Sequence, residues 1–206
     1  MYQYFIAPLF GYLLGSIPSA WIVVKLFTKK DIREEEQKII TTQQTLDLAG
    51  PVAGGIKGLL DLLKGFLSVF FIRYVIFPSF EDVILVTTLA GLGAILGHSW
   101  QIWIGFKGGR AYSVFLGTLT ILNPWGIPIW IVTTVLVFLL VNYTTIAGYI
   151  ATIIIAIVLT FFYAFSVPYW YDWNILLISW GYVLILSVKL IPNFILFFKG
   201  ELPKGR

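Results

Sequence analysis

The sequence predicts an all-α, multi-pass membrane protein from its composition, its hydropathy and the length of its apolar stretches. Hydrophobic residues make up 59% of the chain and charged residues only 12%, and the mean hydropathy is +0.90. This composition is not that of a soluble globular domain. Because no internal repeat or low-complexity linker interrupts the pattern, we expect residues 1–206 to form a single membrane domain.

Seven apolar stretches approach the roughly 20 residues that an α-helix needs to cross a bilayer. They cover residues 4–27, 51–76, 82–104, 111–123, 126–141, 144–165 and 173–191. The first contains Pro18, which should kink the helix, with Ser16 or Ser19 available to bond the freed carbonyl. The fourth and fifth are short, and a single helix kinked at Asn123-Pro124 would reduce the count to six.

The basic residues favour seven transmembrane helices with the N-terminus outside and the C-terminus cytoplasmic. One side of the membrane then holds Lys25, Lys29, Lys30, Arg33, Lys38, Lys107, Arg110, Lys189, Lys199, Lys204 and Arg206. The opposite side holds only Arg73, together with Glu81, Asp82 and Asp172, as the positive-inside rule requires. Six spans would move the basic C-terminal tail outside. The cytoplasmic segments are therefore residues 28–50, 105–110 and 142–143 and the tail from about residue 190.

Cysteine and histidine usage excludes several kinds of site. The chain has no cysteine and one histidine, so disulfides, thiolate metal sites and the usual two-histidine metal motifs are ruled out. We predict no metal site, and no organic cofactor has a signature. The net charge of +4 describes a basic surface facing the membrane, and nucleic-acid binding is not expected.

Pairs of glycines predict where helices pack closely. Three spans each carry glycines four residues apart, which lets backbones approach one another. The pairs are Gly11 with Gly15, Gly54 with Gly58, and Gly93 with Gly97. We expect the core of the bundle to be built on these three pairs.

Three charged residues lie inside the second apolar stretch, namely Lys57, Asp61 and Lys64. Spacings of four and three place them on one helix face as a possible cation–carboxylate–cation ladder. Charges inside a span face a protein interior or a wet cavity and by default indicate function. A structural salt bridge is the alternative for Asp61 with Lys64. Lys57 is nearer the cytoplasmic end, where its side chain could reach the interface.

His98 ends an apolar stretch and is followed by the block Lys107-Gly108-Gly109-Arg110. Two glycines between two cations make a backbone concavity whose N–H groups and charges suit an oxyanion or phosphate. A lone histidine at a helix end is more often structural than a base. Its proximity to the glycine block instead indicates a base and an anion clamp in one pocket at the cytoplasmic face.

Five segments of the chain recur in the order and spacing of a known family. They are Leu14-Gly15-Ser16-Ile17-Pro18; Asp31-Ile32-Arg33; Asp61-Leu62-Leu63-Lys64-Gly65; Gly97-His98 with Phe106-Lys107-Gly108-Gly109-Arg110; and Asn193 with Lys199-Gly200-Glu201 and Pro203-Lys204. Over nearly its full length the chain resembles the bacterial acyl-phosphate glycerol-3-phosphate acyltransferase family, PlsY. The resemblance implies a seven-helix protein of the bacterial inner membrane with a cytoplasmic-side site.

The resemblance also implies an activity, which is transfer of an acyl group from acyl phosphate to glycerol 3-phosphate in phospholipid synthesis. The catalytic residue would be His98, and the phosphate-binding residues would be Lys107, Gly108, Gly109, Arg110 and Asn193. The partners would be these two substrates and membrane lipids, and no cofactor would be needed. The family usually has lysine at Arg110, where arginine keeps the charge and adds a bidentate fork.

The first cytoplasmic loop departs from the family pattern. The family's two glycine- and asparagine-containing runs and its nearby arginine fall here on Glu36-Gln37-Lys38-Ile39, Thr41-Thr42-Gln43-Gln44 and Asp47. Glu34-Glu35-Glu36 would repel phosphate, and the segment is predicted to be a helix ending at Gly50-Pro51. The family's tail arginine is also replaced, by Leu196, and the proline after the histidine by Gln101.

Two functions from different classes remain open. The first is a divergent acyltransferase that keeps His98, Lys107, Arg110 and Asn193 and tolerates the new loop or uses another acceptor. The second is a catalytically inactive descendant that serves as an accessory subunit or lipid-binding scaffold of a membrane complex. A transporter would rest only on the buried Asp61 and Lys64.

Overall fold

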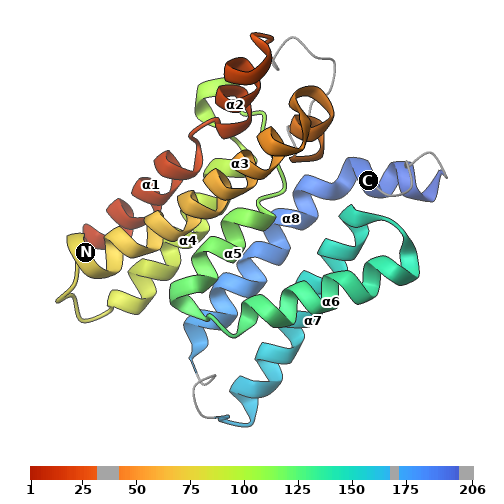
Figure 1. Ribbon diagram of the computed structural model, residues 1–206. Helices are drawn as coiled ribbons and strands as arrows, with labels where there is room; N and C mark the ends of the chain where they lie inside the picture. The colour runs from red at the N-terminus through yellow and green to blue at the C-terminus, as the bar shows by residue number, and fades with distance from the viewer. Residues whose placement is uncertain (32–41, 168–171, 200–206) are drawn as a thin grey trace. The chain divides into compact units, whose positions relative to one another are not determined.

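The computed structural model describes residues 1–31, 42–167 and 172–199, and within these ranges the regular elements are helices (Figure 1). They are α1 (Gln3–Gly15), α2 (Ser19–Thr28), α3 (Thr42–Phe71), η1 (Ile72–Ile76), α4 (Val83–Ser99), η2 (Ile102–Ile104), α5 (Tyr112–Leu122), α6 (Gly126–Val141), α7 (Thr144–Ala164) and α8 (Trp173–Phe198). The predicted all-α class is confirmed. The chain divides into two compact units, Met1–Ile121 and Leu122–Arg206, and the single domain over 1–206 stays a prediction.

The first predicted span is broken at Pro18 into α1 and α2. Pro18 sits immediately before α2 with φ −83° and ψ 69°, because proline cannot continue the hydrogen-bond ladder of α1. The expected repair of a freed carbonyl by a neighbouring serine is wrong. The Ser16 hydroxyl donates to the Gly97 carbonyl of α4 at 3.4 Å, and the Ser19 hydroxyl donates to Asp61 of α3. The serines face other helices, so they join α1 and α2 to them.

The helix α3 consists of two parts that meet at Gly50. Gly50 has φ 85° and ψ 175°, a conformation that glycine adopts without steric cost. Pro51 then begins the second part, as proline favours the first helical position. The predicted helix end at Gly50-Pro51 is thus confirmed for residues 42–49, whereas residues 34–41, including the acidic run, lie outside the described residues.

Four glycines allow α1 and α4 to pack backbone against backbone. A Cβ added at any of them would come within about 2 Å of a carbonyl oxygen on the facing helix. The contacts are Gly11 with Ala90 (1.9 Å), Gly15 with Ala94 (2.1 Å), Gly93 with Pro8 (2.1 Å) and Gly97 with Tyr12 (2.1 Å). Two of the three predicted glycine pairs therefore pack against each other, and they hold α4, which carries His98 at its end, against α1.

The third glycine pair does not form the packing that its spacing predicts. A Cβ at Gly58 would meet nothing within 4 Å, and one at Gly54 would meet the Leu46 side chain at 3.1 Å. A different pair, Gly65 of α3 and Gly117 of α5, makes the close contact instead. Their added Cβ atoms would lie 2.0 Å from the carbonyl oxygens of Val114 and Leu62, respectively. The spacing alone could not tell which face of α3 meets a helix.

The second unit is held together by packing of α7 against α6 and α8. Polar side chains link the helices of each pair. The Trp130 indole of α6 donates to the Thr152 hydroxyl of α7 at 3.0 Å, and the Tyr149 and Ser187 hydroxyls join α7 to α8 at 2.8 Å. Such interhelical hydrogen bonds suit a membrane interior, where water cannot satisfy these groups.

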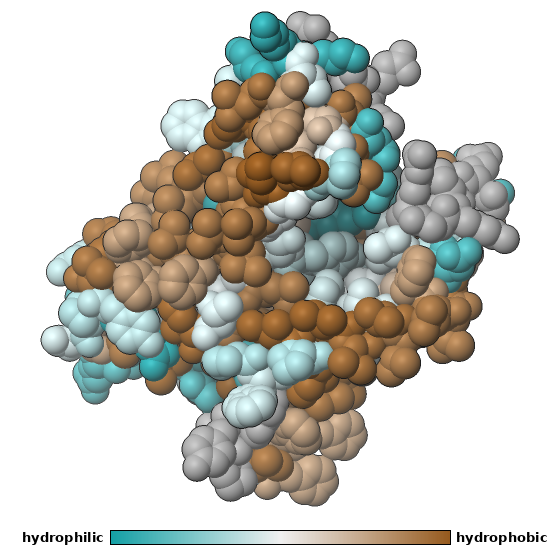
Figure 2. Space-filling model, in the orientation of Figure 1, coloured by the Kyte–Doolittle hydropathy of each residue, from teal (hydrophilic) through white to brown (hydrophobic). Residues whose placement is uncertain are grey.

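Three of the described helical segments are long and apolar enough to cross a membrane. They are Gln3–Thr28, Thr144–Ala164 and Trp173–Leu196. The helices α4, α5 and α6 are apolar but shorter, and the second part of α3 carries three charges. On the face of the first unit that Figure 2 shows, polar residues gather near the N-terminus and near the end of α2, with mostly apolar residues between them.

The glycine packing yields a matched pair of variants. Gly97→Ala places a methyl group against the Tyr12 carbonyl and should destabilise the protein by about 1–3 kcal/mol, as overpacking does. Gly58→Ala meets open space and should leave stability unchanged or raise it by up to about 1 kcal/mol, the helix propensity difference. Thermal unfolding in detergent measures both. A Gly97→Ala variant as stable as Gly58→Ala would contradict the packing.

Candidate anion-binding site around His98

The Asp61 carboxylate lies where α2, α3 and α4 meet. It is 1% exposed. The Lys57 ammonium lies 2.6 Å from Oδ2 and the Lys64 ammonium 2.8 Å from Oδ1, both on α3. The Ser19 hydroxyl of α2 donates to Oδ1 at 2.5 Å and accepts from the Lys64 ammonium at 3.0 Å. We call Lys57, Asp61, Lys64 and Ser19 the Asp61 cluster.

His98 faces this cluster from the end of α4. Its Nδ1 lies 3.5 Å from Oδ1 of Asp61, and the residue is 2% exposed. This separation is too long for a good hydrogen bond but close enough for a strong electrostatic interaction if the ring carries a proton. His98 is thus buried within the first unit, where the carboxylate can influence its charge and orientation.

The chain after His98 folds back on the end of α4. Gln101 and Lys107 form an antiparallel bridge, and η2 lies between them. The Gly109 N–H and the Gln101 side-chain amide both donate to the His98 carbonyl at 3.2 Å. A Cβ at Gly108 would lie 2.3 Å from that same carbonyl. The two glycines therefore let the backbone of the loop pack against the end of α4. Lys107 and Arg110, which flank the glycines, belong to the same loop.

The same contacts revise what the glycine block does. The Gly109 N–H, which the sequence suggested for an anion, already donates within the protein. Lys107 and Arg110 are half-buried, and no ion pair or hydrogen bond to the Lys107 ammonium is found within residues 1–31, 42–167 and 172–199.

The backbone is strained immediately after this block. Ala111 has φ 61°, a left-handed conformation that costs a non-glycine residue about 1–2 kcal/mol. Such strain is typical of positions that a functional site over-determines.

Lys57 does not reach the membrane interface as the sequence suggested. It is 3% exposed, and besides Asp61 its ammonium contacts the Thr42 hydroxyl at 2.9 Å. The ladder that the spacing of Lys57, Asp61 and Lys64 predicts is present. The expectation for Lys57 was wrong because the break at Gly50 lets the start of α3 cover it.

Asn193 belongs to α8 of the second unit. It is 8% exposed, and its Oδ1 has no hydrogen-bond partner within the described residues. A buried amide oxygen without a partner costs free energy. This cost fits a residue that meets a ligand, and its phosphate-binding role remains a proposal.

Sequence reasoning missed three residues of the site. The sequence indicates Ser19 only as a partner for its own helix, and Thr42 and Gln101 only as departures from a family pattern. Ser19 and Thr42 enter the site through the breaks at Pro18 and Gly50, respectively. A proline or glycine inside a predicted span was the available signal, although it does not identify the contact.

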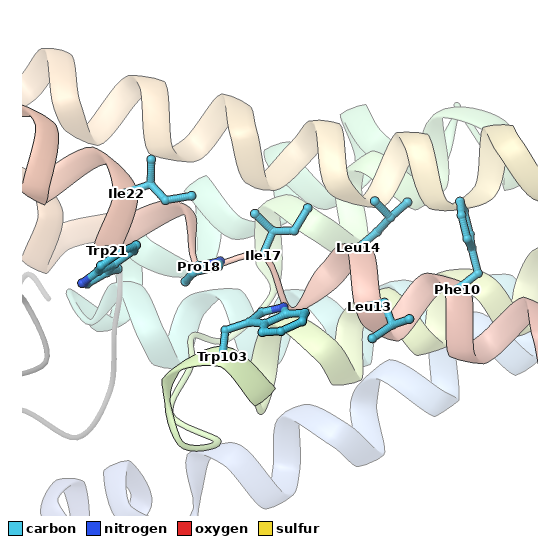
Figure 3. A pocket seen from close by; sticks show the side chains of 8 residues that line it. All are labelled: Phe10, Leu13, Leu14, Ile17, Pro18, Trp21, Ile22 and Trp103. Atoms are coloured by element: carbon cyan, nitrogen blue, oxygen red, sulfur yellow. The ribbon is translucent and has the colours of Figure 1, made fainter.

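An apolar groove lies beside the site at the break between α1 and α2 (Figure 3). Its volume is about 580 Å³, and its lining is apolar: Phe10, Leu13, Leu14, Ile17, Pro18, Trp21, Ile22 and Trp103. Trp103 comes from η2, in the loop that carries Lys107 (Figure 3). Pro18 lines the groove, and the next residue, Ser19, belongs to the Asp61 cluster. The apolar groove and the Asp61 cluster therefore include neighbouring residues of the chain, Pro18 and Ser19.

Comparison with known proteins confirms the resemblance. The model of the glycerol-3-phosphate acyltransferase family matches residues 5–200. The glycerol-3-phosphate acyltransferase of Staphylococcus haemolyticus is 33% identical over 202 residues, covering 94% of each chain. That of Pelagibacter ubique is 31% identical over 160 residues, covering 78% of this chain and 80% of its own.

A solved structure shares the fold. It is PlsY, an integral membrane glycerol 3-phosphate acyltransferase, in its glycerol 3-phosphate form. The TM-score is 0.79 at 25% identity, and the match covers 98% of this chain and 94% of the other. With its apolar helices, this chain is an integral, multi-pass protein of the bacterial cell membrane type, and it belongs to the glycerol-3-phosphate acyltransferase family.

Proposed function

We propose that the chain transfers an acyl group from acyl phosphate to glycerol 3-phosphate at a site centred on His98. One observation carries this proposal. The imidazole, the Asp61 cluster and the loop with Lys107 and Arg110 all meet at the end of α4. Membership of the family and the names of the relatives support the choice of substrates.

The transfer requires an acceptor hydroxyl that loses its proton as it attacks. The hydroxyl oxygen attacks the acyl carbonyl carbon, an ester C–O bond forms, and the bond from the acyl carbon to the phosphate oxygen breaks. Phosphate leaves with the bonding electron pair. We assign His98 to orient the hydroxyl and accept its proton, and Lys107 and Arg110 to hold phosphate oxygens by charge-assisted hydrogen bonds. Gly108 and Gly109 keep these cations close to His98.

The apolar groove completes the proposed site within the first unit, and Asn193 of the second unit is assigned separately. Asn193 is assigned to phosphate binding, for which its amide N–H groups would donate, whereas its buried Oδ1, without a partner among the described residues, suits a hydroxyl donor. The groove supports an acyl-bearing donor, because its lining offers hydrocarbon contacts. An amphiphile with an acyl chain and a phosphate needs both kinds of surface, and Pro18 and Ser19 place them next to each other.

The departure of the first cytoplasmic loop from the family's sequence pattern favours a second candidate function. Within the part of the loop that the structure describes, residues 42–49 form a helix that buries Gln44 and Thr45, and the family's signature residues are absent. A chain that has lost turnover could serve as a lipid-binding scaffold or as an accessory subunit of a membrane complex. Failure of the transfer assay described below would favour this alternative.

We also propose seven transmembrane helices with the N-terminus outside and the C-terminus cytoplasmic, forming one domain over residues 1–206. The positive-inside distribution of lysines and arginines supports this topology. The structure gives α5 and α6 as separate helices that end at Leu122 and begin at Gly126. This separation favours two short spans over the single kinked helix of the six-span alternative.

The proposed reaction predicts the behaviour of three variants. Purified protein given acyl phosphate and labelled glycerol 3-phosphate should form lysophosphatidate. His98→Ala should lower the rate by about 10²–10⁴-fold, the usual contribution of a general base, and Arg110→Ala should raise KM for a phosphate-bearing substrate. Lys25→Ala, an exposed cation of α2, should change neither. Wild-type rates in His98→Ala would refute the assignment of the base.

The glycine loop predicts a difference between two glycine-to-alanine variants. Gly108→Ala puts a methyl group against the His98 carbonyl and must displace the loop. Its kcat/KM should fall by about 100-fold, as when a positioning group moves by about 1 Å. Gly55→Ala meets nothing within 4 Å and should retain full activity. Equal activity of the two variants would mean that the position of the loop does not matter.

The proposed topology can be measured by cysteine labelling, because the chain has no native cysteine. With seven spans, a membrane-impermeant maleimide added to intact cells should label Asp172→Cys but not Lys199→Cys. Six spans predict the reverse. Glu81→Cys and Lys30→Cys are the controls, since both arrangements place them outside and inside, respectively.

A further inference from the structure

The Asp61 cluster contains more positive than negative charge. Lys57 and Lys64 are 3% and 5% exposed, and both pair with the single carboxylate of Asp61. No second carboxylate pairs with either ammonium within the described residues. Counted as two ammonium groups and one carboxylate, the cluster has a formal charge of +1.

An unbalanced buried cation is costly unless it has a partner. Removing a charge from water is repaid only by an opposite charge or by several hydrogen bonds. Charged side chains inside membrane spans are rare for this reason and usually serve a function. One lysine would suffice to neutralise Asp61. The positive charge of the second lysine would be balanced if an anion bound to the cluster.

Lys57 is the lysine placed to receive such an anion. Thr42 and Lys57 are fifteen residues apart, which in a continuous helix would separate them by about 22 Å along the axis. The break at Gly50 instead folds residues 42–49 back, so that the Thr42 hydroxyl contacts the Lys57 ammonium at 2.9 Å. The close contact of Gly54 with Leu46 shows that the two parts of α3 pack together. An ammonium and a hydroxyl side by side suit an oxyanion.

The cluster is also continuous with the proposed reaction site. Asp61 contacts both Lys57 and the His98 ring, while the loop that carries Lys107 and Arg110 bonds the His98 carbonyl. Segments that carry cations thus flank the same histidine, α3 through Asp61 and the loop through its backbone. Two phosphate-bearing substrates present two anionic groups that such cations can bind.

We propose that Lys57, with the Thr42 hydroxyl and Lys64, forms a second oxyanion subsite beside His98, whose ligand is a phosphate monoester. The inference rests on the proposed function, since it assigns one of the two substrate phosphates to this cluster. Lys107 and Arg110 then serve the other phosphate. Binding of the anion brings the formal charge of the cluster to zero or below.

Equilibrium binding without turnover tests this subsite. The full chain in detergent is titrated with inorganic phosphate, with glycerol 3-phosphate and with a non-hydrolysable acyl phosphonate. Lys57→Met should weaken at least one of the three by tenfold or more, the loss expected for a charged hydrogen bond. The probe that is affected identifies which substrate uses the subsite. Lys25→Met, which removes an exposed cation from α2, should leave all three within threefold of wild type.

The stability of the anion-free protein separates this role from a structural ion pair. If Lys57 is the excess cation, Lys57→Met should unfold at the same temperature as wild type or higher, because Asp61 keeps Lys64. A lower unfolding temperature together with weaker binding would identify a structural ion pair and overturn the proposal. Unchanged binding of all three probes, or no binding by wild type, would also overturn it. Should Lys57→Met not yield monodisperse protein, Lys57→Gln is titrated in its place.

The outcome is distinguishable from that of the proposed function. A wild-type chain that binds phosphate through Lys57 but forms no lysophosphatidate would refute acyl transfer and leave the subsite standing. A chain that forms product while Lys57→Met binds every probe normally would refute the subsite alone.

Discussion

The buried Asp61 carboxylate links α2, α3 and α4 of the first unit through its ionic and hydrogen-bond partners. A buried carboxylate is tolerated only when its charge and its lone pairs are satisfied, and here the partners come from three helices. Lys57 and Lys64 belong to the helix of Asp61, whereas Ser19 belongs to α2 and the His98 ring approaches from α4. The positions of α2 and α4 are thus coupled to one side chain, and so is the position of the loop that follows His98.

Close helix packing makes this arrangement possible. The glycines of α1 and α4 bring the two backbones together, which fixes how α4 lies and therefore where His98 points. The Ser16 hydroxyl adds a long hydrogen bond to the Gly97 carbonyl at 3.4 Å. In a membrane, helices associate through packing and hydrogen bonds of this kind, since burial of apolar surface gives little driving force there. A polar site of fixed geometry therefore depends on residues that have no polar side chain.

Local spacing predicts the parts of this site that lie on one helix, and it fails for the parts that depend on packing. The ladder of Lys57, Asp61 and Lys64 could be predicted because residues three and four apart share a helix face. The contact of Asp61 with Ser19 could not, because it requires α2 to turn at Pro18 and pack on α3. The four-residue spacing of Gly58 with Gly54 misled for the same reason, since spacing does not reveal which face meets another helix.

The helix breaks at Pro18 and Gly50 place polar side chains inside an otherwise apolar bundle. A continuous first helix would continue the apolar face of α1 past Pro18. The break instead leaves Pro18 in an apolar groove and turns Ser19 inward to the Asp61 carboxylate. The break at Gly50 likewise turns Thr42 inward, so that its hydroxyl contacts the Lys57 ammonium. Helix breaks are tolerated in membranes only where neighbouring groups satisfy the backbone or where the chain lines a cavity. At both positions the break forms part of the candidate site.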